Sequence, residues 1–125
     1  MKTLFRGMQA DPDGRPRCGS TARTLGVRVP EDIAPDDDGR VHPGTGGMSV
    51  APDDPMRLRP HRRPRELGGT GPDPVFALPT AKLGASLAAH QDRPDHVMVE
   101  PRVVVDFAFY IRALHDTRPG LSRVT

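Results

Sequence analysis

Apolar residues occur along the chain in short runs that are separated by long polar stretches. A run of roughly four to eight residues that is apolar throughout, or that alternates apolar and polar positions, is typical of a β-strand. The runs predict strands at Thr3–Met8, Met48–Val50, Val75–Leu78 and His96–Glu100. Thr24–Val29 is a weaker candidate, and Leu83–Ala89 fits either a short helix or a further strand.

One amphipathic helix is predicted near the end of the sequence. Phe107, Ile111 and Leu114 follow the i, i+4, i+7 spacing that puts side chains on one face of a helix. We place this helix from about Val105 to about Asp116. The valines just before it are β-branched and favour an extended lead-in.

The segment between the second and third predicted strands has the poorest apolar pattern. Ala51 to Pro79 contains seven prolines, and proline cannot donate a hydrogen bond to a strand ladder, so long regular strands are not expected there. Residues 52–74 combine proline with charge and leave little to bury, which predicts a mobile loop.

A cluster of basic residues lies inside that segment. Its members are Arg57, Arg59, His61, Arg62, Arg63 and Arg65. Such a cluster could contact phosphates. No aromatic residue is interleaved for stacking on bases, and three prolines interrupt any continuous basic helix. We therefore favour a mobile loop over a nucleic-acid site.

Composition predicts one small domain, residues 1–125. Of the 125 residues 35% are apolar, and the chain also contains 15 Pro and 13 Gly. We therefore expect a small core and a chain that is largely loop. The formal net charge of +2 gives no strong field that would demand a nucleic acid or a membrane surface as partner. Cys18 is the only cysteine, so we expect no disulfide and no multi-cysteine metal site.

No targeting segment is recognisable in the sequence. Before Arg6 the chain holds only the apolar pair Leu4 and Phe5, too short for the apolar region of a secretory signal. No apolar run approaches the roughly 20 residues of a membrane span. We expect a protein that is made in the cytoplasm and that, if it leaves its cell, does so without a cleavable signal.

Two elements are candidates for ligand binding. In Gly44–Val50 the glycines allow a tight turn, and Ser49 points away from the face that carries Met48 and Val50. That hydroxyl could hold a polar ligand, or it could simply face water. Arg6 lies on an inward face of the first strand, where its planar fork would need an anion such as a phosphate; the alternative is an arginine that reaches solvent.

The order of these motifs resembles the small ADP-ribosyltransferase-like toxins delivered by bacterial type VI secretion. The resemblance rests on Leu4-Phe5-Arg6, Gly46-Gly47-Met48-Ser49-Val50, the stretch from Asp92 through His96 to Pro101, and the final helix. Met48 departs from the pattern, because a smaller or hydroxyl residue is expected there. The resemblance implies an α+β fold of two small packed β-sheets with an NAD-sized cleft between them, few helices and long Pro/Gly-rich loops.

The resemblance also implies roles for single residues. Arg6, Gly46 and Gly47 are expected to bind NAD, Ser49 to orient the nicotinamide ribose, and His96 either to face the cleft or to seal the sheet edge. NAD is then the expected substrate and a cytoplasmic macromolecule the target. A small cognate immunity protein is the expected partner.

Cleavage of the nicotinamide–ribose bond passes through an oxocarbenium-like centre that carboxylates stabilise. Glu100 shares a strand face with His96 and Met98 and is the candidate catalytic acid, unless it is a strand-end glutamate in solvent. A second interpretation is a non-enzymatic interaction module, or degenerate relative, that binds a protein or a nucleic acid. A neighbouring gene for an immunity protein would favour the toxin interpretation over the interaction module.

Overall fold

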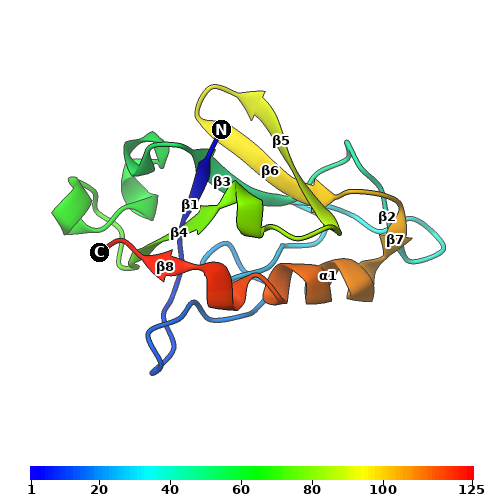
Figure 1. Cartoon of the computed structure of the whole chain (residues 1–125), viewed down its shortest axis with the longest axis horizontal. Helices are drawn as coiled ribbons and strands as arrows, with labels where there is room; N and C mark the ends of the chain where they lie inside the picture. The colour runs from blue at the N-terminus through cyan, green and yellow to red at the C-terminus, as the bar shows by residue number, and fades with distance from the viewer.

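All 125 residues are described by the computed structural model, and Figure 1 shows how its elements are arranged. The strands are β1 (Thr3–Gly7), β2 (Arg40–Val41), β3 (Met48–Pro52), β4 (Val75–Pro79), β5 (Leu87–Arg93), β6 (His96–Pro101), β7 (Val105–Asp106) and β8 (Ser122–Arg123). The helix α1 spans Phe107–His115, and short 3-10 turns lie at Pro55–Arg57, Pro60–Arg62, Arg65–Leu67, Thr80–Lys82 and Arg118–Gly120. The predicted α+β class with few helices is confirmed.

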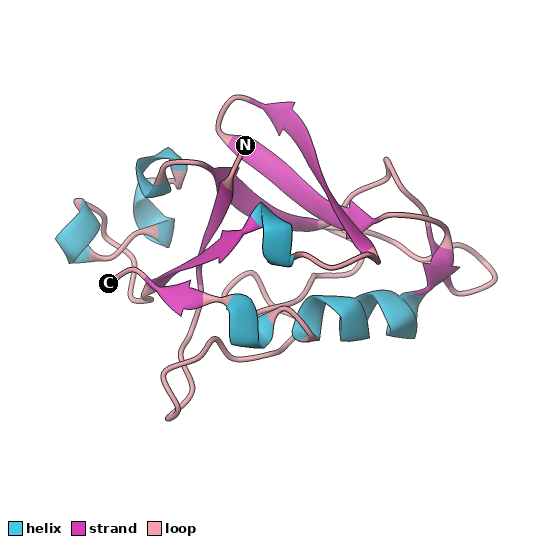
Figure 2. Cartoon of the chain, in the orientation of Figure 1, coloured by secondary structure: helices cyan, strands magenta, loops and turns pink.

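The strands form two antiparallel sheets of unequal size. The larger sheet has six strands in the order β5-β6-β3-β1-β4-β8, and the smaller is the pair β2-β7. β1 lies inside the larger sheet, where it pairs with β3 on one side and β4 on the other. Figure 2 shows the long loop that connects β1 to β2 and confirms the expected share of loop. A side chain of β1 therefore sits at the centre of the molecule.

One cluster of buried apolar side chains joins the sheet, the long loop and α1. Leu4 and Phe76 enter it from the sheet, Val27 from the loop and Leu114 from the helix, and each is at most 1% exposed. This cluster explains how a chain with so few apolar residues folds, because three separate elements share one core.

The helix begins two residues later than predicted, because Val105 and Asp106 form β7 as its extended lead-in. Its buried face is also rotated, with Tyr110 and Leu114 fully buried and Phe107 half-buried. The Tyr110 hydroxyl donates to the Val99 carbonyl at 2.6 Å and accepts from the backbone N–H of Met48 at 3.2 Å, so it ties α1 to both β3 and β6. No helix combines the length and apolar character that crossing a membrane requires.

Two predicted elements differ from the structure. Thr24–Val29 forms no strand, because the carbonyls of Thr24 and Gly26 accept hydrogen bonds from the Arg6 side chain and not from a neighbouring strand. The ambiguous segment Leu83–Ala89 resolves into β5, which starts at Leu87 and continues to Arg93. The turn between β5 and β6 is therefore only Pro94–Asp95.

The proline-rich segment forms three 3-10 turns and no regular strand before β4, as its prolines predict. Its backbone is closed by hydrogen bonds from Thr70 to the Pro60 carbonyl and from Gly71 to the Arg63 carbonyl, at 2.9 and 2.8 Å. The segment packs on β1, where a Cβ added to Gly7 would lie 2.4 Å from the Arg62 carbonyl oxygen. Whether residues 52–74 are mobile stays a prediction.

We expect limited proteolysis to cut first within residues 52–74. Between the end of β3 and the start of β4, Pro64 is the only buried residue. The turns can therefore unfold with little loss of core contact. Mass spectrometry of the first fragments gives the cleavage site. First cleavage between Val97 and Leu114, within the core strands and α1, would contradict this expectation.

Candidate functional site

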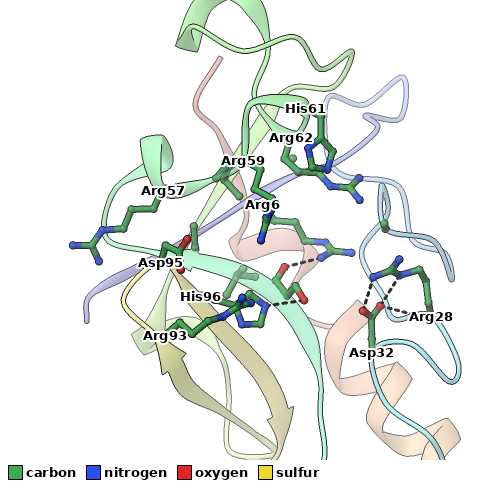
Figure 3. A pocket seen from close by; sticks show the side chains of 16 residues that line it. Arg6, Arg28, Asp32, Arg57, Arg59, His61, Arg62, Arg93, Asp95 and His96 are labelled. Atoms are coloured by element: carbon green, nitrogen blue, oxygen red, sulfur yellow. Dashed lines mark hydrogen bonds and ion pairs between the residues drawn. The ribbon is translucent and has the colours of Figure 1, made fainter.

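A pocket of about 400 Å³ opens where β1 and β3 meet the 3-10 turns and the tip of the β5–β6 hairpin. This volume lies within the roughly 300–1,000 Å³ of small-molecule sites. Figure 3 shows the side chains that line it. Three of the predicted site residues, Arg6, Ser49 and His96, come together on its walls.

The pocket is strongly basic. Six arginines line it, against two aspartates, Asp32 and Asp95, so its formal charge is +4 while the whole chain carries only +2. The arginines are Arg6, Arg28, Arg57, Arg59, Arg62 and Arg93. Such a local excess of positive charge favours an anionic ligand. The sequence analysis did not predict this basic pocket, because the basic cluster was interpreted as a mobile loop.

Arg6 lies at the floor of this pocket and is 6% exposed. Its Nε and Nη2 atoms donate to the Thr24 carbonyl at 3.1 and 2.9 Å, and Nη1 donates to the Ser49 carbonyl at 2.6 Å. The fork expected to bind phosphate is therefore largely occupied by main-chain oxygens. Arg6 links β1 to β3 and to the long loop, and a direct contact with NAD stays a prediction for its remaining N–H.

Burial lowers the pKa of Arg6 to about 10, so its guanidinium remains charged at neutral pH. Asp32 opposes this shift, whereas the nearby charges of Arg62 and Arg28 add to it. Asp32 is already paired with Arg28, whose Nη2 lies 2.9 Å from its Oδ1. The side chain of Arg62 makes no hydrogen bond or ion pair within the chain, and Figure 3 shows it beside Arg6. Like charges held this close favour a bound anion between them.

Ser49 and His96 contact each other across neighbouring strands. Ser49 faces Met98 directly in the β3–β6 register, and His96 is two residues further along β6, on the same face. The His96 Nε2 atom lies 3.1 Å from Ser49 Oγ, and the opposite ring nitrogen, Nδ1, lies 2.6 Å from Asp92 Oδ1. The expectation that His96 faces the cleft agrees with this position.

The glycines and the glutamate of the predicted site lie outside the pocket lining. Gly46 has a φ of 144° and packs so closely on the Asp32 carbonyl that a Cβ would lie 2.0 Å from its oxygen. A Cβ on Gly47 would lie 2.4 Å from the Val99 carbonyl oxygen. Because these glycines have no side chain, the main chain can pass close to the Asp32 and Val99 carbonyls. Their contact with a ligand stays a prediction.

Glu100 is 8% exposed and accepts a hydrogen bond from the backbone N–H of Gly44 at 2.7 Å, while its other oxygen lies 3.5 Å from His90 Nδ1. Glu100 is four positions from His96, which is a distance of about 13 Å along β6. Glu100 thus fixes the glycine turn, and its catalytic role gains no support from this position. It is buried, so the alternative of a glutamate in solvent is wrong.

The arrangement can perform two kinds of chemistry. The arginines can hold phosphate groups, and an imidazole hydrogen-bonded to a hydroxyl can accept a proton. Sequence reasoning missed Asp92, Arg28 and Arg62. The only signal for Asp92 in the sequence was its place four residues before His96.

A comparison with known protein families identifies the family of the chain. The model of the Tse2 ADP-ribosyltransferase toxin family matches residues 2–116, a range that contains every residue of the pocket. No curated protein sequence matches the chain significantly. The family match covers nearly the whole sequence, and its fold class agrees with the two antiparallel sheets and single α-helix described above. The chain therefore belongs to the Tse2 ADP-ribosyltransferase toxin family.

Proposed function

We propose that this toxin binds NAD in the arginine-lined pocket, cleaves its nicotinamide–ribose bond and transfers ADP-ribose to a macromolecule in the cytoplasm of a target cell. The proposal is carried by one observation, the contact between Ser49 and His96 on the wall of the arginine-lined pocket. Hydroxyl and imidazole suit the ribose, and the arginines suit the pyrophosphate.

The phosphates are assigned to Arg62, with Arg28 beside it. Arg62 has no partner within the chain, whereas Arg28 is paired with Asp32 and Arg6 is bound to carbonyls. A pyrophosphate placed there would offset the repulsion among these three cations. The nicotinamide ribose would then lie beside Ser49 and His96.

In the proposed reaction the bond between C1′ of the ribose and the nicotinamide nitrogen breaks, and nicotinamide leaves with the bonding electrons. A nucleophilic group of the acceptor, or water, forms the new bond to C1′ and gives up a proton. His96 Nε2 is the nearest base to Ser49 Oγ and is assigned to take that proton.

A toxin that acts on cytoplasmic NAD endangers the cell that makes it. We therefore propose delivery through type VI secretion and a small immunity protein that covers the pocket mouth. The test is inducible expression in a bacterial cytoplasm with and without the neighbouring gene. Growth arrest that the neighbour relieves is the expected result, and its product should protect β1 and β3 in hydrogen exchange. Protection confined to residues outside the pocket lining, such as those of α1, would contradict occlusion of the pocket.

We expect Arg62→Gln to raise the KM for NAD about tenfold with a smaller change in kcat, because a charge-assisted contact to phosphate is lost in both the ground state and the transition state. Steady-state kinetics of nicotinamide release measure both constants. Arg65→Gln is the matched control, since Arg65 is exposed on the next 3-10 turn and lies outside the pocket. Equal KM values for the two variants would remove Arg62 from the phosphate site.

A further inference from the structure

We propose that Asp92 is a positioning residue for this reaction. Its carboxylate holds the proton of neutral His96 on Nδ1, so that Nε2 faces Ser49 as a hydrogen-bond acceptor. The inference rests on the proposed function. Asp92 does not line the pocket, so it would act on NAD only through His96.

The hydrogen-bond geometry specifies the tautomer. Asp92 Oδ1 lies 2.6 Å from Nδ1 of His96, and an ionised carboxylate can only accept, so Nδ1 must donate. A neutral imidazole carries one N–H, and Nε2 is then left with a lone pair. Ser49 Oγ, 3.1 Å from Nε2, donates its proton to that lone pair. The same order of carboxylate, imidazole and hydroxyl orients the histidine in serine hydrolases of unrelated folds.

An irregularity in β5 places the carboxylate. The β5–β6 register shifts between Gln91, which pairs with Val97, and Arg93, which pairs with His96. Asp92 is the extra residue of this bulge. Bulges bend a strand and re-aim a side chain, and they are frequent beside active sites. Asp92 therefore has no direct partner in the β5–β6 pairing, and its carboxylate reaches His96 Nδ1 from the bulge.

The charges around Asp92 favour its ionised form. Partial burial opposes ionisation, but the hydrogen bond from His96 and the charge of Arg93 favour it, and the pKa of Asp92 lies below its usual value. Arg93 Nε lies 3.9 Å from Asp92 Oδ2, so the second oxygen also faces a cation. The side chain of His96 is 21% exposed, which leaves its ring a restricted space to turn.

The chain contains a matched control for this pair. His42 Nε2 lies 2.6 Å from Asp36 Oδ2, the same separation, but both side chains are more exposed and neither lines the pocket. Asp36→Asn removes a carboxylate from a histidine in the same way as Asp92→Asn, without touching the proposed site.

The first measurement is the ¹⁵N–¹H NMR correlation spectrum of the histidine rings in the wild-type protein without NAD. We expect His96 to carry its proton on Nδ1. In Asp92→Asn the amide can donate to Nδ1, so we expect a shift toward the Nε2–H form, with no such change at His96 in Asp36→Asn. A wild-type His96 protonated on Nε2 alone would overturn the inference, whether or not any variant folds.

The second measurement is nicotinamide release from NAD. We expect kcat of Asp92→Asn to fall by about a hundredfold, with KM changed far less, because general-base action is lost and binding is retained. Asp92→Glu, which keeps a carboxylate, should recover part of the rate. Full kcat in a folded Asp92→Asn protein would overturn the inference. A wild-type protein that releases no nicotinamide would refute the proposed function instead, and the NMR spectrum would still decide where the proton lies.

Discussion

Ser49→Ala is expected to relieve growth arrest on induction while the purified variant melts at the wild-type temperature. The substitution removes the hydroxyl that contacts His96 and very little volume, at a position that is half-buried on the pocket wall. Losing one hydrogen bond to a bound polar group costs about 1–3 kcal/mol, which is about ten- to a hundredfold in activity.

Ser122→Ala is the matched control for this substitution. Ser122 lies on the exposed edge strand β8, its side chain has no hydrogen-bond partner in the chain, and it is remote from the pocket lining. We expect full toxicity from this variant. Full toxicity from Ser49→Ala as well would remove Ser49 from the site, whereas a large fall in its melting temperature would mean that the hydroxyl is structural.

Arg6→Lys is expected to destabilise the protein. An ammonium cannot reach the carbonyls of Thr24 and Ser49 together, because these lie on opposite sides of the planar fork that now spans them. Each buried carbonyl left without its donor costs about 1–3 kcal/mol, out of the roughly 5–15 kcal/mol by which domains are stable. The melting temperature should fall by about 10 °C or more.

Thermal unfolding followed by circular dichroism measures this shift, with Arg65→Lys as the control on an exposed arginine. Toxicity should fall together with stability. An unchanged melting temperature with lost toxicity would contradict the structural role of Arg6, and would favour the direct contact with NAD that the sequence suggested.

Local patterns predicted most of the regular elements. The strands β1, β3, β4 and β6 and the helix α1 were all expected, because each one is specified by the apolar spacing of a few consecutive residues. The loop at Thr24 was assigned as a weak strand for the same reason. Its carbonyls are used by Arg6, which is 18 residues away in the sequence, and no local pattern shows such a partner.

The candidate site was predicted only in part. Ser49 and His96 came from their order in the sequence, and their contact across 47 residues required the register of β3 and β6. Asp92 was missed because no strand was predicted at this position, so its place beside His96 in the β5–β6 hairpin was not foreseen. The basic pocket was missed because a net charge of +2 averages over the chain and conceals the arginines that the fold gathers.

The function proposed for this pocket is cleavage of NAD at Ser49 and His96. The most direct measurement is the release of nicotinamide from NAD by the purified wild-type protein and by the Ser49→Ala variant. Chromatography monitors the released nicotinamide under single-turnover conditions. We expect the wild type to release nicotinamide and the variant to do so at a rate lower by about ten- to a hundredfold. Release at equal rates by both proteins, or no release and no NAD binding by a folded wild-type protein, would contradict it.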